Sequence, residues 1–263
     1  MATKDYAAIA AASITRPADS KRKPKILIYS RNKKGKTTFS ISAGVEKTLV
    51  IDPERGTDEM KTKNPHVWHI TRWEELDDVY NYIRYTKHEY EWIVLDGLTK
   101  INNMALKYVM KLQEEKSLDR IPGLVQQRDY GKSGELMKDL LTRFHGLPFG
   151  VVFTAQERQD DPGDSEEDED SEDVSTIFIP DLPKGVRSYI NSIVDVIGRL
   201  YVVKTDVKGK EVAQRRLWIG ESTRYDTGYR SDYKLPDNIK DPTVPKLVLL
   251  MRTGSISRPQ PKK

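Results

Sequence analysis

The stretch KILIYSRNKKGKTTFS, residues 25–40, decides the fold. Its first six residues are mostly apolar, which predicts a short buried strand over Lys25–Ser30. The polar, basic loop RNKKGK follows, and TTFSISAG is expected to begin a helix. A strand that passes through a tight, Gly-containing loop into a helix can bind an anion at the helix N-terminus.

The loop matches the end of the phosphate-binding pattern G-x-x-x-x-G-K-[ST], with Ser30 in place of the first Gly. In that pattern the loop N–H groups curve around phosphate oxygens, the Lys reaches the β- and γ-phosphates, and the Ser/Thr hydroxyl binds Mg²⁺. The alternative is a basic turn that binds no nucleotide. We predict a site for ATP and Mg²⁺ whose nucleotide-binding residues are Ser30, Arg31, Asn32, Lys33, Lys34, Gly35, Lys36, Thr37 and Thr38.

Two acidic residues follow later apolar runs. Asp96 ends the run WIVLD, where a carboxylate can orient Mg²⁺ together with Thr37. Glu54 follows TLVID in the sequence VIDPERG, where a carboxylate can face the γ-phosphate and align water. Each acid alone is compatible with an ordinary strand end or surface turn. The carboxyl ends of parallel strands meet at one sheet edge, however, so both acids are expected to lie beside the phosphate-binding loop.

The rest of the chain alternates apolar strands with amphipathic helices. Strands are expected at 25–30, 48–52, 92–96 and 150–155, and helices at 73–86, 101–112, 134–145 and 183–191. This order predicts an α/β fold with a mostly parallel central sheet flanked by helices. Residues 194–204 and 212–219 predict a β-hairpin in a β-rich C-terminal extension, and 243–252 a last helix.

Charge is distributed unevenly. Residues 160–173, DDPGDSEEDEDSED, carry ten acidic and no basic side chains, while the remaining residues carry 44 basic and 30 acidic ones, a net charge of +14. Such a body attracts polyanions, and the acidic run is expected to be a disordered loop. We expect a flexible or partly helical lead-in over 1–23, one domain over 24–252 and a basic tail over 253–263.

The absence of cysteine excludes disulfides and thiolate chemistry. His66 and His69 are interpreted as a solvated pair and not as metal ligands. No run is apolar and long enough to cross a membrane and no signal peptide is recognised, so a cytoplasmic protein is expected.

The segments KILIYSRNKKGKTTFS, LVIDPERG, WIVLDGLT and GVVFTAQER occur in the order of a RecA-type core. Together with IPDLPKGVRSYINSIVDVIGRL and TRYDTGYRSDYKLPDNI, they resemble the phage-encoded RecA-like single-strand-annealing proteins from about residue 25 to about 239. The resemblance implies a RecA-like P-loop ATPase that acts on single-stranded DNA as a homo-oligomer, a ring or a filament. It implies the host cytoplasm as location and a single-stranded-DNA-binding protein as a further candidate partner.

The resemblance also implies roles for individual residues. Lys36 and Glu54 are the expected catalytic residues, and Gln156 is the expected sensor of the γ-phosphate. Arg230 lies where relatives carry a basic residue that reaches a neighbouring subunit's nucleotide, with Arg224 as the alternative.

The resemblance implies DNA contacts in two places, the segment between the third and fourth predicted strands and the loop after Gln156. The acidic run occupies that loop and should repel phosphates, so either DNA binds at the first place or the run is a gate or a partner-docking segment. An exposed basic helix face without DNA is the competing interpretation. Two other functions stay open: a nucleotide-binding regulator or loader with little turnover, which contacts proteins through the acidic run, and a small-molecule kinase. The DNA-binding candidates are Lys107, Lys111, Lys116, Arg120, Arg128, Lys132 and, for base stacking, Tyr130.

Overall fold

A mixed sheet runs through the part of the chain that the computed structural model describes, residues 5–14, 16, 22–117, 119–160, 176–207 and 210–256. Its strands are β1 (Lys25–Ser30), β2 (Thr48–Asp52), β3 (His66–His69), β4 (Trp92–Asp96), β5 (Gly150–Asp160), β6 (Ile177–Pro180), β7 (Val196–Val207), β8 (Lys210–Trp218), β9 (Gly228–Tyr229) and β10 (Asn238–Lys240). They run in the order β10-β8-β7-β1-β5-β4-β2-β3, with β6 on β5 and β9 on β7.

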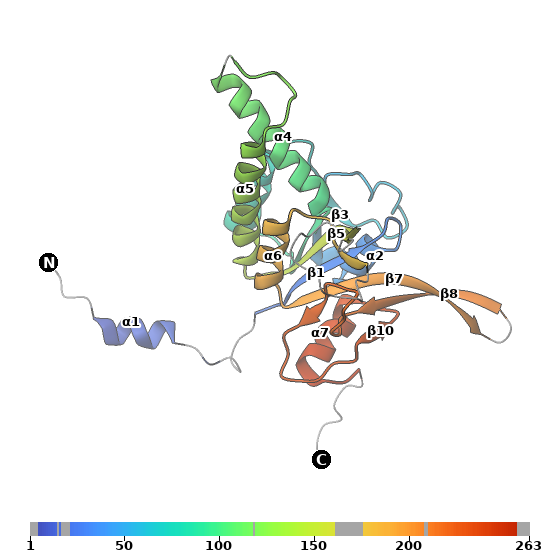
Figure 1. The fold of residues 1–263 in the computed structure, drawn as a ribbon. Helices are drawn as coiled ribbons and strands as arrows, with labels where there is room; N and C mark the ends of the chain where they lie inside the picture. The colour runs from blue at the N-terminus through green and yellow to red at the C-terminus, as the bar shows by residue number, and fades with distance from the viewer. Residues whose placement is uncertain are drawn as a thin grey trace, which may run out of the picture.

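Helices cover both faces of this sheet (Figure 1). The covering helices are α2 (Lys36–Ser40), α3 (Glu75–Tyr85), α4 (Leu98–Lys116), α5 (Gln127–His145), α6 (Lys184–Ile193) and α7 (Val244–Thr253), with two 3₁₀ turns, η2 (Ile41–Ala43) and η3 (Val45–Lys47). A further helix, α1 (Tyr6–Ser13), precedes β1, and none of its described residues belongs to the core on either face. Among the described residues, no helix combines the length and apolar character needed to cross a lipid bilayer.

The core follows the two-residue period of the strands. Within β1, Leu27 and Tyr29 pack on α3 to α6, whereas Ile26 and Ile28 pack on α2, η2 and α7. The burial of both faces explains why β1, β2 and β4 are buried along their whole length and read as continuous apolar runs.

The predicted parallel centre is confirmed. Strands β7, β1, β5, β4, β2 and β3 are mutually parallel, and their register aligns the carboxyl ends. Ser30 lies opposite Gln156, and Asp96 lies opposite Thr154. The residues that follow these strands therefore share one edge of the sheet, which we call the carboxyl edge.

The predicted β-rich C-terminal segment continues the same sheet. β7 pairs in parallel with β1, and β8 and β10 continue the sheet as antiparallel neighbours. The last β1–β7 pair is Tyr29 with Arg199, so the rest of β7 and its partner β8 run on past the end of β1. Figure 1 shows this hairpin projecting beyond the body.

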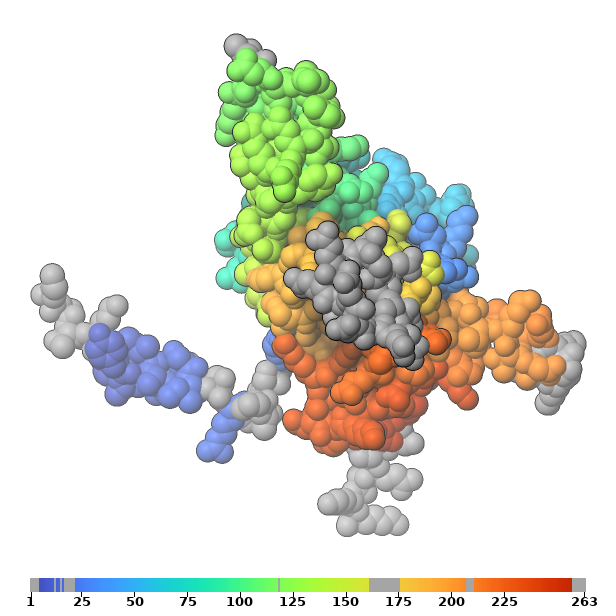
Figure 2. Space-filling model, viewed as in Figure 1, coloured from blue at the N-terminus to red at the C-terminus, as the bar shows by residue number. Residues whose placement is uncertain are grey.

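Helices α4 and α5 pack against each other and form a projection that we call the helical arm (Figures 1 and 2). Its first helix begins at Leu98, directly after the end of β4. The arm therefore starts at the carboxyl edge of the sheet.

Three predicted segments fall partly outside the described residues. Of the lead-in 1–23, residues 6–13 form α1, whose N-terminus is capped by Asp5. Of the acidic run, Asp160 alone is described, and it is the last residue of β5, which is longer than predicted. Residues 257–263 of the basic tail are not described, and α7 includes Thr253.

Candidate functional site

The loop between β1 and α2 contains two left-handed residues, and neither is the position at which its sequence departs from the usual pattern. Lys33 has φ 59° and Gly35 has φ 98°. A non-glycine residue in this region costs about 1–2 kcal/mol, whereas Gly35 adopts it freely. Ser30 is buried in the last position of β1, outside the left-handed region. Its replacement of the first Gly therefore adds no backbone strain of this kind.

Lys36 begins α2 and turns its ammonium group toward the loop. Its Nζ donates to the carbonyl of Ser30 over 3.1 Å and to the Ser30 hydroxyl over 3.3 Å. Burial lowers the Lys36 pKa, while the carboxylates of Asp96 and Glu54 act in the opposite direction. Because α2 has only five residues, this ammonium and the loop N–H groups, and not a long helix dipole, carry the attraction for an anion.

Asp96, the last residue of β4, is hydrogen-bonded to α2 and to β5 through its two carboxylate oxygens. Its Oδ2 accepts from the Thr37 hydroxyl over 2.6 Å, and its Oδ1 accepts from the Thr154 hydroxyl over 2.7 Å. Burial raises the Asp96 pKa, and the two hydroxyl bonds oppose that shift. Hydroxyl and carboxylate oxygens are the ligands that Mg²⁺ prefers, so Thr37 and Asp96 fit the predicted metal role. In the described residues, no cluster of three or more His, Asp or Glu side chains offers another metal site.

Glu54 stands at the same edge on a turn that Asp52 organises. The Asp52 carboxylate accepts from the Glu54 N–H over 2.8 Å and from both the N–H and the hydroxyl of Thr57. Glu54 reaches across to Gly97, whose φ of 116° favours glycine. Partial burial and then the charge of Asp96 raise the Glu54 pKa. A carboxylate with a raised pKa is better suited to accept a proton near neutral pH.

Gln156 lies in β5 beside the end of β1. Its backbone N–H donates to the Thr99 hydroxyl over 3.1 Å, and its carbonyl accepts from Asp181. The following residue, Glu157, pairs with Arg31 of the loop and with Arg199 of β7. This strand therefore links the loop to α4 and to the hairpin.

These residues surround a cavity of about 540 Å³. It brings together most of the predicted nucleotide, metal and catalytic residues, although Ser30, Arg31 and Lys34 do not line it directly. Sequence reasoning missed Asp52, Thr154 and Arg215. An Asp two residues before the predicted catalytic acid was an available signal, because such side chains often accept from the N–H two residues on. The lining residues are Asn32, Lys33, Gly35, Lys36, Thr37, Thr38, Asp52, Glu54, Gly56, Met60, Asp96, Gly97, Thr154, Gln156 and Arg215.

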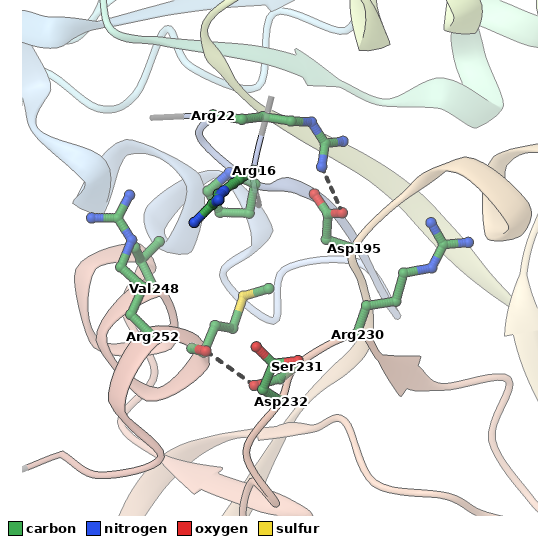
Figure 3. Close-up of a pocket in the computed structure, with 10 residues that line it drawn as sticks. Arg16, Arg22, Asp195, Arg230, Ser231, Asp232, Val248 and Arg252 are labelled. Atoms are coloured by element: carbon green, nitrogen blue, oxygen red, sulfur yellow. Dashed lines mark hydrogen bonds and ion pairs between the residues drawn. The ribbon is translucent and has the colours of Figure 1, made fainter. Parts of the chain in front are cut away.

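Arg230 lies at the opposite edge of the sheet within its own chain. Its backbone N–H donates to the carbonyl of Asp195. The backbone N–H of Asp195 in turn donates to the carbonyl of Lys25, at the start of β1. Figure 3 shows Arg230 beside a second cavity, of about 660 Å³, in which Arg22 pairs with Asp195. Arg230 therefore does not line the cavity that contains Lys36. The alternative residue, Arg224, is exposed beside β6.

Six of the predicted DNA-binding side chains are exposed on the helical arm, but Arg120 is not. Arg120 is 5% exposed and forms an ion pair with the fully buried Asp129. The expectation that Arg120 is available to DNA is therefore wrong, because its guanidinium is enclosed by the arm itself. The exposed residues are Lys107, Lys111, Arg128, Tyr130 and Lys132, and Lys116 is exposed at the end of α4.

Comparison with known proteins identifies the family. Residues 22–231 match the family described as AAA domain. No curated protein matches the chain significantly. Among solved structures, the KaiC-like protein of the hyperthermophilic archaeon Pyrococcus horikoshii OT3 is similar, with 15% identity and a TM-score of 0.43 over 79% of this chain and 82% of that one. Because the family match spans most of the sequence and includes the phosphate-binding loop, this chain belongs to the AAA-domain family and is a P-loop NTPase.

Proposed function

We propose that the cavity at the carboxyl edge binds ATP with Mg²⁺ and hydrolyses it. The observation that carries the proposal is the convergence of Lys36 and Thr37 of α2 with Asp96 of β4, with Glu54 facing the same space. One cation, a metal-binding oxygen pair and a carboxylate with a raised pKa are the groups that triphosphate hydrolysis requires.

Each of these residues has a distinct role in the proposed reaction. Lys36 neutralises the phosphate oxygens, and Thr37 and Asp96 hold the metal ion, which when bound offsets charge on the β- and γ-phosphates. Glu54 orients a water molecule and accepts its proton as the water oxygen attacks the γ-phosphorus. The bond from that phosphorus to the bridging oxygen breaks, and ADP leaves with the electron pair. Gln156, at the wall of the cavity, is placed to sense the γ-phosphate.

We propose further that the protein acts on single-stranded DNA as a RecA-like recombination protein, in annealing or strand pairing. The exposed Lys107 and Lys111 of α4 support this role, because α4 begins directly after Gly97 in the cavity wall. A change at the γ-phosphate then has a short path to the helical arm through Gln156 and Thr99, the second residue of α4. Assembly into an oligomer with Arg230 reaching a neighbouring nucleotide belongs to the same proposal.

The test is steady-state phosphate release with and without single-stranded DNA. The proposal predicts Mg²⁺-dependent turnover that DNA accelerates. Tight ATP binding without turnover in either condition contradicts hydrolysis and favours a regulator or loader. Turnover that DNA leaves unchanged contradicts the DNA role alone, and transfer of the phosphate to a small acceptor favours a kinase.

A further inference from the structure

The β7–β8 hairpin carries an arginine back to the phosphate-binding loop. Arg215 of β8 pairs with Val202, which lies beyond Arg199, the last β7 residue in register with β1. Leu217, two residues further along β8, packs in the core with Phe39 of α2. Because side chains on a strand alternate between its faces, Arg215 lies on the same face as α2.

The guanidinium of Arg215 rests on the glycine of the loop. A Cβ atom at Gly35 would lie 2.6 Å from Arg215 Nε and 3.2 Å from Cζ. The left-handed backbone favours glycine at position 35, and the Arg215 side chain occupies the space that a Cβ atom there would fill. The same arginine lines the cavity that holds Lys36 and Thr37.

The charge of Arg215 is uncompensated among the described residues, where its guanidinium has no hydrogen bond or ion pair. The two neighbouring arginines differ, since Arg31 and Arg199 both pair with Glu157. Further along the hairpin, Lys204 pairs with Glu211. A guanidinium presents a planar set of donors that matches phosphate oxygens, so an unpaired one beside a phosphate-binding loop is suited to an anion.

A third cavity, of about 390 Å³, adjoins the cavity that holds Lys36 and shares Thr38 and Arg215 with it. Its walls include Ile41, Val45 and Pro242, which suit a base and ribose better than a phosphate. Arg215 therefore stands between a phosphate compartment and an apolar one. That position corresponds to the α- and β-phosphates, whereas Glu54 marks the side of the γ-phosphate.

We propose that Arg215 is a nucleotide-binding residue that contacts the α- or β-phosphate from within the same chain. The proposal rests on the proposed function, because it assumes that the loop binds a nucleotide. It differs from a subunit-bridging arginine in that Arg215 needs no neighbouring copy. It also assigns the hairpin a part in the site.

The test compares ATP and ADP affinities of the full chain with Mg²⁺ for wild type, Arg215→Ala, Arg215→Lys and the charge-matched control Lys204→Ala. We expect Arg215→Ala to lower the affinity for both ATP and ADP by about ten- to a hundredfold, because one charge-assisted hydrogen-bonding group is lost. Arg215→Lys should retain part of the affinity, and Lys204→Ala should behave as wild type. Thermal unfolding without nucleotide should be unchanged in Arg215→Ala, because the side chain is exposed.

Three results overturn the proposal. Equal nucleotide affinities in wild type and Arg215→Ala would show that Arg215 does not bind the nucleotide. A loss of affinity for ATP alone would place the arginine at the γ-phosphate instead. An equal loss in Lys204→Ala reduces the effect to general charge. If wild type itself binds neither nucleotide, the proposed function fails together with this inference, whereas normal wild-type binding with an unaffected Arg215→Ala variant contradicts this inference alone.

Discussion

The hydroxyl of Thr37 donates a hydrogen bond to Oδ2 of Asp96 over 2.6 Å. This bond joins the phosphate-binding loop to the end of β4, although β5 lies between β1 and β4 in the sheet. The intervening strand supplies Thr154, which holds the other carboxylate oxygen. Asp96 is thereby held by hydroxyls on both sides.

Asp96→Asn should remove Mg²⁺-dependent turnover. We expect a loss of about a hundredfold or more, because a neutral amide replaces the carboxylate that orients the metal ion. ATP hydrolysis measured against Mg²⁺ concentration checks this, and ADP binding in the presence of a chelator serves as the control for an intact loop. An unchanged Mg²⁺ response would remove Asp96 from the site.

Glu54→Gln should separate binding from hydrolysis. Nucleotide affinity should stay near wild type, while turnover falls by about 10²–10⁴-fold through the loss of the proton acceptor. In the wild type the rate should rise with pH through an apparent pKa above the ordinary 4.5 of a glutamate, because the group must be ionised. Single-turnover rates across pH measure both effects, and a variant that hydrolyses at the wild-type rate contradicts the assignment.

The same substitution should stabilise the nucleotide-free protein. Because the Glu54 pKa is raised in the folded state, the folded chain keeps a proton that the unfolded chain has released between 4.5 and the raised value. The ionised form therefore lowers stability fully above the raised pKa and not at all well below 4.5. Denaturant unfolding should give Glu54→Gln a higher free energy of unfolding at pH 7.5, and a gain that persists at low pH contradicts this explanation.

Arg120→Ala should act on folding and not on DNA. Its removal leaves the buried carboxylate of Asp129 without its partner, at a cost of about 3–5 kcal/mol. Chemical denaturation measures this loss. Unchanged stability would contradict the buried ion pair and return Arg120 to the set of surface cations.

Replacing both Lys107 and Lys111 with Ala should weaken binding of single-stranded DNA and reduce its salt dependence. Each lysine that neutralises a phosphate contributes about 0.7 to the slope of log K against log salt, so the slope should fall by about 1.4. Fluorescence anisotropy at several salt concentrations gives the slope. The exposed Lys47, which pairs with Glu89 away from the arm, provides a control variant. Equal slopes for the control and the double variant contradict a DNA-binding role for α4.

The sequence predicted best the parts of the fold that are buried on both sides. The strand that ends at Asp52 and the strand that ends at Asp96 are continuous apolar runs, and their bounds agree with the structure. Strand β3 was missed because it lies at the sheet edge and has only four residues, two of them the histidines His66 and His69 that were interpreted as a solvated pair. The pairing of β7 with β1 could not be predicted, because the two strands are distant in the sequence and no local pattern indicates which strands pair.

The site was predicted to the extent that its residues lie at strand ends. Lys36, Thr37, Glu54 and Asp96 each follow or end an apolar run, and the parallel register brings them together. Arg215 could not be predicted, because its position depends on how far the hairpin extends past β1.

Calorimetric titration of ATP with Mg²⁺ into wild type and Lys36→Ala tests the nucleotide site most directly. The Lys36 ammonium is the positive charge that lies inside the loop, so its removal should weaken ATP binding on the order of a hundredfold or more. We predict saturable binding of one ATP per chain in wild type and no measurable binding in Lys36→Ala, with unchanged circular dichroism. Absence of binding in wild type, or equal affinity in the two proteins, would contradict the account.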